Sequence, residues 1–148
     1  MIRFSCALML MISLGLPATA QDHDHDHDHD HDHDHSHDHA VDFETLSGGL
    51  EALAVVTQEI RQAVDASDMG SLHELSDELH AVADGLAVHA DDVAEASRGR
   101  FTGAVNQMRA LSDRLHTAEE TGDSAAAAQI ASQIEAMMPL VRMSAGIS

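Results

Sequence analysis

Histidine and aspartate alternate along residues 22–39, which read DHDHDHDHDHDHDHSHDH. Neutral imidazole is the commonest nitrogen ligand of borderline divalent metals, and carboxylate adds an oxygen ligand and negative charge. The candidate metal ligands of this run are its nine histidines: His23, His25, His27, His29, His31, His33, His35, His37 and His39. With about four ligands for each tetrahedral ion, they could hold on the order of two to four zinc ions.

No apolar side chain interrupts this run, so folding would bury too little surface to offset the entropy lost on ordering it. We therefore expect a disordered tail over residues 21–40 when no ligand is bound. A solvated acidic spacer and an affinity tag are the two alternatives. A spacer has no use for nine imidazoles, and tags are normally plain histidine runs, so the pattern favours metal binding.

The first twenty residues are typical of a secretory signal peptide. Arg3 supplies a positive start, residues 4–16 are apolar but shorter than the about 20 residues of a membrane span, and residues 18–20 fit the small-x-small cleavage pattern. We expect cleavage to release a periplasmic chain with no membrane-inserted segment. The only cysteine, Cys6, lies in this leader, which rules out thiolate metal sites, disulfides and cysteine catalysis in the mature chain.

Cleavage after residue 20 would place His23 third in the chain, behind Gln21 and Asp22. The amine, two backbone nitrogens and the imidazole of such an N-terminus can form a square plane, which suits Cu(II) and Ni(II). An N-terminal glutamine can also cyclise and lose its amine. A copper or nickel site at the start of the tail is therefore an alternative to a zinc site.

The part of the chain after the leader is strongly acidic. It holds all 26 aspartates and glutamates against six arginines and no lysine, a formal charge of −20 with histidine neutral. Such a chain repels nucleic-acid phosphates and anionic lipid surfaces, so we expect no nucleic acid as a partner. Metal cations are attracted instead.

Apolar residues recur with a helical period from about residue 42 to residue 143, and they predict four helices. In the first helix Gly48 and Gly49 weaken the opening turns, so we expect its stable part to begin at Leu50. Asp68 is the expected N-cap of the second helix, which we expect to reach residue 96 before a break at residues 98–100.

The last two helices are bounded by similar signals. Gly122 is the expected left-handed residue after the third helix, and Asp123 or Ser124 would cap the fourth. Pro139 predicts a kink or an end inside the fourth helix. Met108 and Met137 lie in the apolar stripes, so core filling is favoured over copper(I) or haem ligation for these residues and their neighbour Met138.

The apolar stripes superpose when the chain is shifted by 55 residues without a gap, which places Leu50 on Val105 and Leu79 on Ile134. The pattern therefore predicts a helical hairpin that is used twice. Two amphipathic hairpins bury their stripes best against each other, which favours an all-α, antiparallel four-helix bundle over residues 41–148.

Four histidines lie outside the tail, and none superposes on a histidine in the repeat, so packing does not require them. The candidate second metal site follows spacings of 4, 3 and 4 along one stripe of the second helix and comprises His73, Asp77, His80 and Asp84. It could equally dock metal passed from the tail. A solvated polar face is the alternative, because a pair of ligands on one helix usually needs a third from another helix. His116 is the candidate for that third ligand.

The segment LHELSDEL at residues 72–79 resembles the H-E-L-[ST]-x-x-L helix of small exported helical proteins. The layout is similar to that of periplasmic four-helix-bundle cytochromes without their haem ligands. The tail resembles the histidine-rich loops of periplasmic zinc-uptake binding proteins and of nickel and cobalt chaperones. The resemblance of the tail implies capture and hand-over of a metal, as in a metallochaperone, and it implies no fold.

We expect a periplasmic protein that binds, buffers or chaperones zinc, nickel, cobalt or copper, with zinc as the first expectation. It would pass the metal to a transporter or to the transporter's binding protein. The alternative is a helical interaction module of a metal efflux or sensing complex, in which the tail is a low-affinity accessory. The sequence holds no H-E-x-x-H motif, nucleophile elbow or glycine-rich phosphate loop, so we expect no enzyme.

Overall fold

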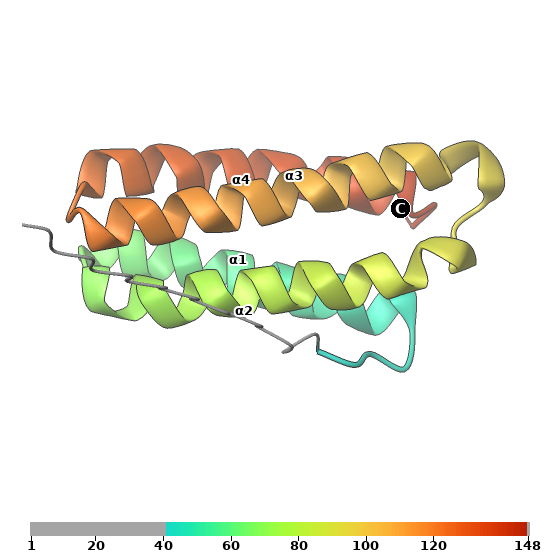
Figure 1. Ribbon diagram of the computed structural model, residues 1–148, viewed down its shortest axis with the longest axis horizontal. Helices are drawn as coiled ribbons and strands as arrows, with labels where there is room; N and C mark the ends of the chain where they lie inside the picture. The colour runs from blue at the N-terminus through green and yellow to red at the C-terminus, as the bar shows by residue number, and fades with distance from the viewer. Residues whose placement is uncertain (1–40, 148) are drawn as a thin grey trace, which may run out of the picture. The chain divides into compact units, whose positions relative to one another are not determined.

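The computed structural model describes residues 41–147, so the expected signal peptide and the expected disordered tail lie outside the described residues. Within this range all regular secondary structure is helical, which confirms the all-α prediction. Figure 1 shows the elements, which are α1 (Leu46–Ala66), α2 (Met69–Val88), the 3₁₀ turn η1 (His89–Asp92), α3 (Glu95–Glu120) and α4 (Ser124–Ser144). Over residues 41–147, none of these helices combines the length and the apolarity needed to cross a bilayer.

The helices lie alongside one another, and the apolar stripes predicted from the sequence meet between them (Figure 1). Helix α2 packs on α1 and α3, and helix α4 packs on α3 and α1. The largest fully buried side chains are Leu50, Leu53, Val56, Ile60, Leu72, Leu79, Leu86, Phe101, Met108, Leu111, Leu115 and Ile134. Met108 thus fills the core as predicted.

Helix α1 begins at Leu46, so the predicted start at Leu50 is wrong. The hydroxyl of Thr45 accepts a hydrogen bond from the backbone N–H of Gly48 at 3.1 Å and caps the helix. Gly49 lies close to α2, and a Cβ there would lie 2.7 Å from Cδ2 of Leu86, which would have to shift. The cap and this close approach compensate for the low helix propensity of the two glycines.

The connection between α2 and α3 also differs from the prediction. Helix α2 ends at Val88, well before residue 96, and residues 98–100 lie inside α3. The chain turns through residues 89–94, where Val93 is extended and buried. Arg98 donates a hydrogen bond from Nε to the carbonyl oxygen of Ala90 at 3.1 Å, which fastens the first turn of α3 to the connection.

The remaining predicted boundaries agree with the structure, except at Pro139. Asp68 caps α2 by accepting from the N–H of Ser71 at 3.3 Å, and Asp123 caps α4. Gly122 has a φ of 65°, the left-handed conformation expected after α3. Helix α4 continues through Pro139 to Ser144, so the proline does not end it.

Residues 41–45, which we name the N-terminal strap, lie against α2. The N–H of Val41 donates to the carbonyl oxygen of Ala81 at 3.4 Å, and the carbonyl oxygen of Phe43 lies 2.9 Å from Nε2 of His89. A Cβ at Gly85 would overlap the carbonyl oxygen of Val41 and lie 2.6 Å from the Phe43 ring. Only glycine at this position lets the strap pass so close to the helix.

Candidate metal centre

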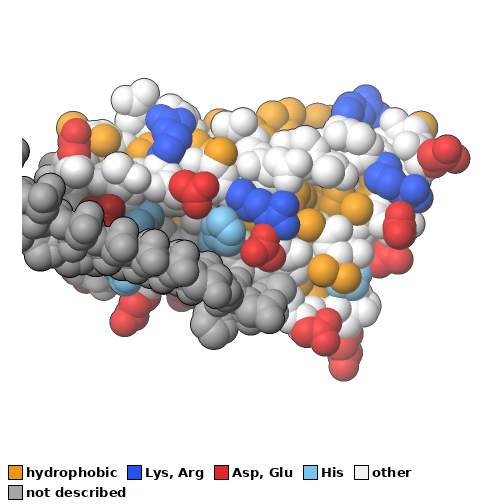
Figure 2. Space-filling view, in the orientation of Figure 1, with side chains coloured by type: hydrophobic (Ala, Val, Ile, Leu, Met, Phe, Trp, Pro, Cys, Tyr) orange, Lys and Arg blue, Asp and Glu red, His pale blue; other side chains and the backbone are white. Residues whose placement is uncertain are grey.

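The contact face between α2 and α3, which we name the seam, carries three of the four histidines that lie outside the tail. His73 and His80 come from α2, and His116 comes from α3. Figure 2 shows histidine side chains among acidic and arginine side chains on the face that α2 and α3 form. The carboxylates that lie within 4.0 Å of these imidazoles are those of Asp77, Asp84, Asp113, Glu119 and Glu120.

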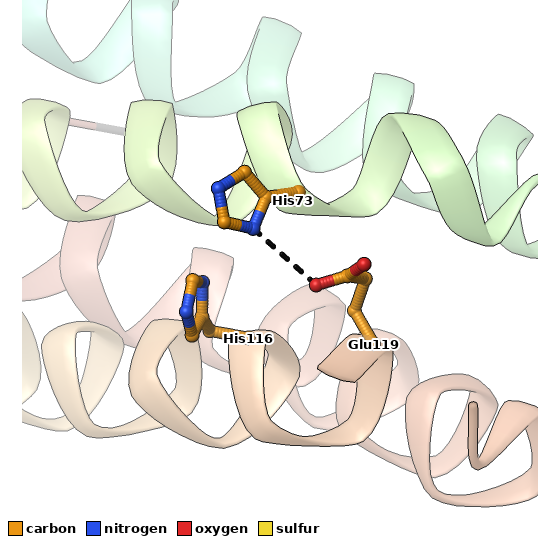
Figure 3. A group of neighbouring side chains, drawn as sticks. All are labelled: His73, His116 and Glu119. Carbon is orange, nitrogen blue, oxygen red and sulfur yellow. Dashed lines mark hydrogen bonds and ion pairs between the residues drawn. The ribbon is translucent and has the colours of Figure 1, made fainter. Parts of the chain in front are cut away.

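His73, His116 and Glu119 come together as a set of metal-ligand groups (Figure 3). One nitrogen of each imidazole and one carboxylate oxygen all lie within 4.8 Å of one another. Nδ1 of His73 lies 3.3 Å from Oε2 of Glu119, and the two imidazole centroids lie 4.7 Å apart. Imidazole nitrogen and carboxylate oxygen are ligands that zinc and related divalent metals accept.

Coordination would require only small movements of these side chains. Ligand atoms about 2.0–2.1 Å from a tetrahedral zinc ion lie about 3.4 Å from one another. The side chain of His73 is 51% exposed, and those of His116 and Glu119 are 34% and 22% exposed. Because these side chains are partly exposed, they can rotate until their ligand atoms are closer together by about 1 Å, as coordination requires. An ion can also reach them from solvent.

Asp77 lies near both histidines, but it faces Nε2 of His73, whereas Glu119 faces Nδ1 of the same ring. Oδ2 of Asp77 lies 3.9 Å from Nε2 of His73, and its Oδ1 lies 3.9 Å from Nδ1 of His116. We name these four residues the seam cluster: His73, Asp77, His116 and Glu119. Since one ion can bind only one nitrogen of His73, Asp77 can join Glu119 on that ion only after the His73 ring or the Asp77 side chain turns. With that turn the cluster offers two nitrogen and two oxygen ligands, drawn from two helices.

His80 and Asp84, the other half of the site predicted on α2, have different partners. Nδ1 of His80 lies 3.3 Å from Oδ1 of Asp113, and its Nε2 lies 3.6 Å from Oδ2 of Asp84. The guanidinium of Arg109 forms an ion pair with Asp84. This positive charge opposes the binding of a second cation beside Asp84.

An open groove with a volume of about 240 Å³ lies along the seam. Asp77, His80 and Asp84 of α2 line one side, and Asp113 and His116 of α3 line the other. Since a water molecule takes about 30 Å³ in the liquid, the groove has room for a hydrated ion.

Two buried serines connect α2 to α3 beneath the seam cluster. Ser76 donates its hydroxyl hydrogen to the carbonyl oxygen of His73 at 2.7 Å, and its Oγ lies 3.4 Å from Nδ1 of His116. The hydroxyl of Ser112 donates to the carbonyl oxygen of Ser76 at 2.8 Å. Such supporting hydrogen bonds hold the ring orientation of metal-binding histidines.

Glu119 and Ser76 were missed by the sequence analysis. Glu119 follows His116 by three residues, one helical turn, and this spacing could have indicated a shared site. The sequence does not give the register between α2 and α3, and that register decides which residues of α3 face His73.

His89 lies apart from the seam and belongs to the N-terminal strap. Its Nδ1 lies 2.7 Å from Oδ2 of Asp92, and its Nε2 lies 2.9 Å from the carbonyl oxygen of Phe43. The hydrogen bond with Asp92, followed by that with Phe43, raises the pKa of His89 above its usual value. Both ring nitrogens face an acceptor, which assigns His89 a structural role.

The seam cluster thus joins two imidazoles and two carboxylates across two helices, and this donor set suits a borderline divalent metal. The predicted residues His73 and Asp77 belong to it, whereas His80 and Asp84 lie further along α2 with Asp113 and Arg109. No protein-family model, curated protein or solved structure matches this chain.

Proposed function

We propose that this protein is exported to the periplasm, where it binds and delivers a divalent transition metal, with zinc before nickel, cobalt and copper. The observation that carries this proposal is the run of nine histidines that alternate with aspartates over residues 22–39. The aspartates raise the local concentration of cations, and the imidazoles coordinate them in His-x-His pairs. The role is binding and transfer rather than catalysis.

We further propose that the helical domain is an antiparallel four-helix bundle made of two repeated hairpins. The contacts of α1 with α2, α2 with α3, α3 with α4, and α4 with α1 support this arrangement. The repeat supports it as well, because Leu50 and its equivalent Val105 are both buried, as are Leu79 and its equivalent Ile134. Such a domain would give the tail a rigid carrier.

The seam is the proposed receiving site for metal from the tail. The N–H of Val41 donates to the carbonyl oxygen of Ala81, and Ala81 lines the groove along the seam. In the sequence, His39 precedes Val41 by only two residues. The histidine run is thus joined to the domain where the strap meets the groove, and the proposed acceptor of the metal is a periplasmic transporter or its binding protein.

Calorimetric titration with zinc tests the role of the tail. The native chain is compared with a variant in which all nine tail histidines are replaced by asparagine, which keeps the length and every aspartate. We expect the native chain to bind on the order of two to four more zinc ions than the variant. Equal stoichiometry for the two chains would remove the tail from the proposed function.

A second candidate function, an interaction module in an efflux or sensing complex, is favoured by an apolar groove between α3 and α4. Its volume is about 590 Å³, and it is lined in part by Met137, Leu140 and Met143. Leu140 is 49% exposed and Met143 is 69% exposed. Exposed apolar surface of this kind often marks a protein contact.

The two functions predict different requirements for metal tolerance in cells. If the protein acts through its tail, replacing the tail histidines abolishes any tolerance that it confers, and Leu140→Ser leaves tolerance intact. If it acts as an interaction module, the two variants give the reverse result. Zinc titration of the Leu140→Ser protein checks that metal binding itself is unchanged.

A further inference from the structure

We propose that one divalent metal ion at the seam cluster clamps α2 to α3 at the end of the helix pair where no chain connection joins them. This inference deepens the proposed function and rests on it. It adds an ordered site with a defined ligand set, His73, Asp77, His116 and Glu119. It also means that the bound metal stabilises the contact between α2 and α3.

The position of the cluster makes a clamp effective. His73 lies in the second turn of α2, which begins at Met69, and Glu119 lies in the last turn of α3, which ends at Glu120. The connection of the two helices, coloured yellow in Figure 1, leaves their other ends. His73 and Glu119 are 46 residues apart in the sequence. An ion held by both would therefore join two distant parts of the chain, and it would stabilise the folded domain because the unfolded chain does not hold these ligands together.

The charges around the seam favour a cation at this cluster. Within residues 41–147, the carboxylates of Asp77 and Glu119 pair with histidines and with no arginine. Asp84, further along the same face, pairs with Arg109. Among the described residues no arginine neutralises the negative charge of the cluster, and a divalent ion can do so.

The internal repeat shows that the fold itself does not need these residues. All four positions of the cluster carry a different residue in the other half of the repeat. The equivalents of His73, Asp77, His116 and Glu119 are, in that order, Ala128, Ser132, Arg61 and Val64. At the equivalent positions the helices therefore pack without an imidazole or a carboxylate.

The ligand set selects the class of metal. Two imidazole nitrogens and two carboxylate oxygens suit Zn(II) and Co(II), whereas Ca(II) and Mg(II) prefer oxygen ligands alone. Copper(I) prefers thiolate and thioether ligands, and the cluster contains neither.

Thermal unfolding of the full chain, followed by circular dichroism with and without zinc, tests the clamp. Zinc at the seam cluster binds only the folded domain, so it should raise the Tm by about 10 °C or more at a free zinc concentration about 100-fold above the Kd. Zinc bound only by a tail that is disordered, as the sequence predicts, would give no such rise, because its histidines would be as available in the unfolded chain as in the folded one.

Three variants of the full chain distinguish the outcomes. The double variant His73→Asn/His116→Asn should lose the zinc-induced rise in Tm. The matched control His80→Asn, on the same helix, and the variant with nine tail asparagines should keep it. A native chain that binds several zinc ions without a rise in Tm would overturn the clamp and leave the proposed function standing. The clamp would also be overturned if the double variant kept the zinc-induced rise in Tm. It would be overturned as well if the single variant His80→Asn lost that rise.

A spectroscopic measurement keeps the proposal testable if the double variant folds poorly. Cobalt(II) bound to the variant with nine tail asparagines should show the intense visible absorption of a tetrahedral site with nitrogen and oxygen ligands. The intensity should fall when Glu119→Gln is added to that chain. An unchanged spectrum, or the weak spectrum of hydrated cobalt from the start, would contradict a site at the seam cluster.

Discussion

The imidazole rings of His73 on α2 and His116 on α3 lie with their centroids 4.7 Å apart and their planes tilted by 41°. Two neutral imidazoles at this separation can share a cation, whereas two imidazolium rings would repel each other. The carboxylate oxygens of Asp77 lie 3.9 Å from Nε2 of His73 and 3.9 Å from Nδ1 of His116. Oε2 of Glu119 lies 3.3 Å from Nδ1 of His73. The seam is thus a contact between helices with the ligand chemistry of a metal site.

The substitution Glu119→Gln should weaken zinc binding at the seam by at least about tenfold, because it removes the negative charge of one ligand and keeps its size. Competition with a chromophoric chelator, in the variant with nine tail asparagines, measures this affinity. Asp113→Asn is the matched control, since Asp113 lies on the same helix and pairs with His80. An equal loss in the control would assign the effect to general electrostatics.

The substitution Arg109→Gln should create an additional zinc site. It removes the guanidinium that pairs with Asp84, and it leaves Asp84 and Asp113 both close to His80. We expect one more zinc ion per chain in the tail-asparagine background, measured by calorimetry. An unchanged stoichiometry would show that the arginine is not what excludes metal from this part of the seam.

Two glycine substitutions should have opposite effects on stability. Gly85→Ala places a Cβ against Val41 and Phe43, so it should displace the N-terminal strap and lower the free energy of unfolding by about 1–3 kcal/mol. Gly103 lies in α3, where an added Cβ would have no atom within 4 Å. Gly103→Ala should therefore raise the free energy of unfolding by about 0.5–1 kcal/mol. Urea unfolding measures both, and a Gly85→Ala variant as stable as the native chain would contradict the close passage of the strap.

The raised pKa of His89 predicts a pH-dependent contribution to stability. The hydrogen bonds with Asp92 and Phe43 favour the protonated ring, and the carboxylates of Asp92 and Asp42 add to this effect. The contribution is therefore complete below the usual histidine pKa of about 6.5 and is lost as the pH rises through the raised value.

The variant His89→Gln measures this contribution. In metal-free buffer it should be less stable than the native chain by about 1–2 kcal/mol at pH 5.5, and the difference should shrink towards pH 8.5. Thermal unfolding across this range gives the comparison. A difference that grows with rising pH would have the wrong sign for an imidazolium held by Asp92.

The sequence predicted the core well because burial imposes the helical period on residues such as Leu50, Leu79 and Ile134. It misplaced the start of α1 because the value of Gly49 lies in its contact with Leu86, a residue of another helix. It misplaced the turn between α2 and α3 because residues 89–94 contain neither glycine nor proline. Local signals therefore located the stripes, and tertiary contacts decided these boundaries.

In the candidate site, too, the sequence predicted the neighbours on one helix but not the contacts between helices. His73 and Asp77 lie one turn apart on a single helix, so their spacing in the sequence brings them together. The position of Glu119 beside His73 and the pairing of Arg109 with Asp84 both depend on how α3 is aligned with α2. No single-helix pattern contains that alignment.

Equilibrium dialysis of residues 21–148 measures metal binding directly. The chain is dialysed against zinc, nickel, cobalt and copper in turn at neutral pH. The metal retained per chain is then counted by mass spectrometry. We expect the chain to retain several zinc ions, in line with about four ligands per ion for the nine tail histidines and one further ion at the seam. A chain that retains none of the four metals would contradict a role in metal binding for both the tail and the seam.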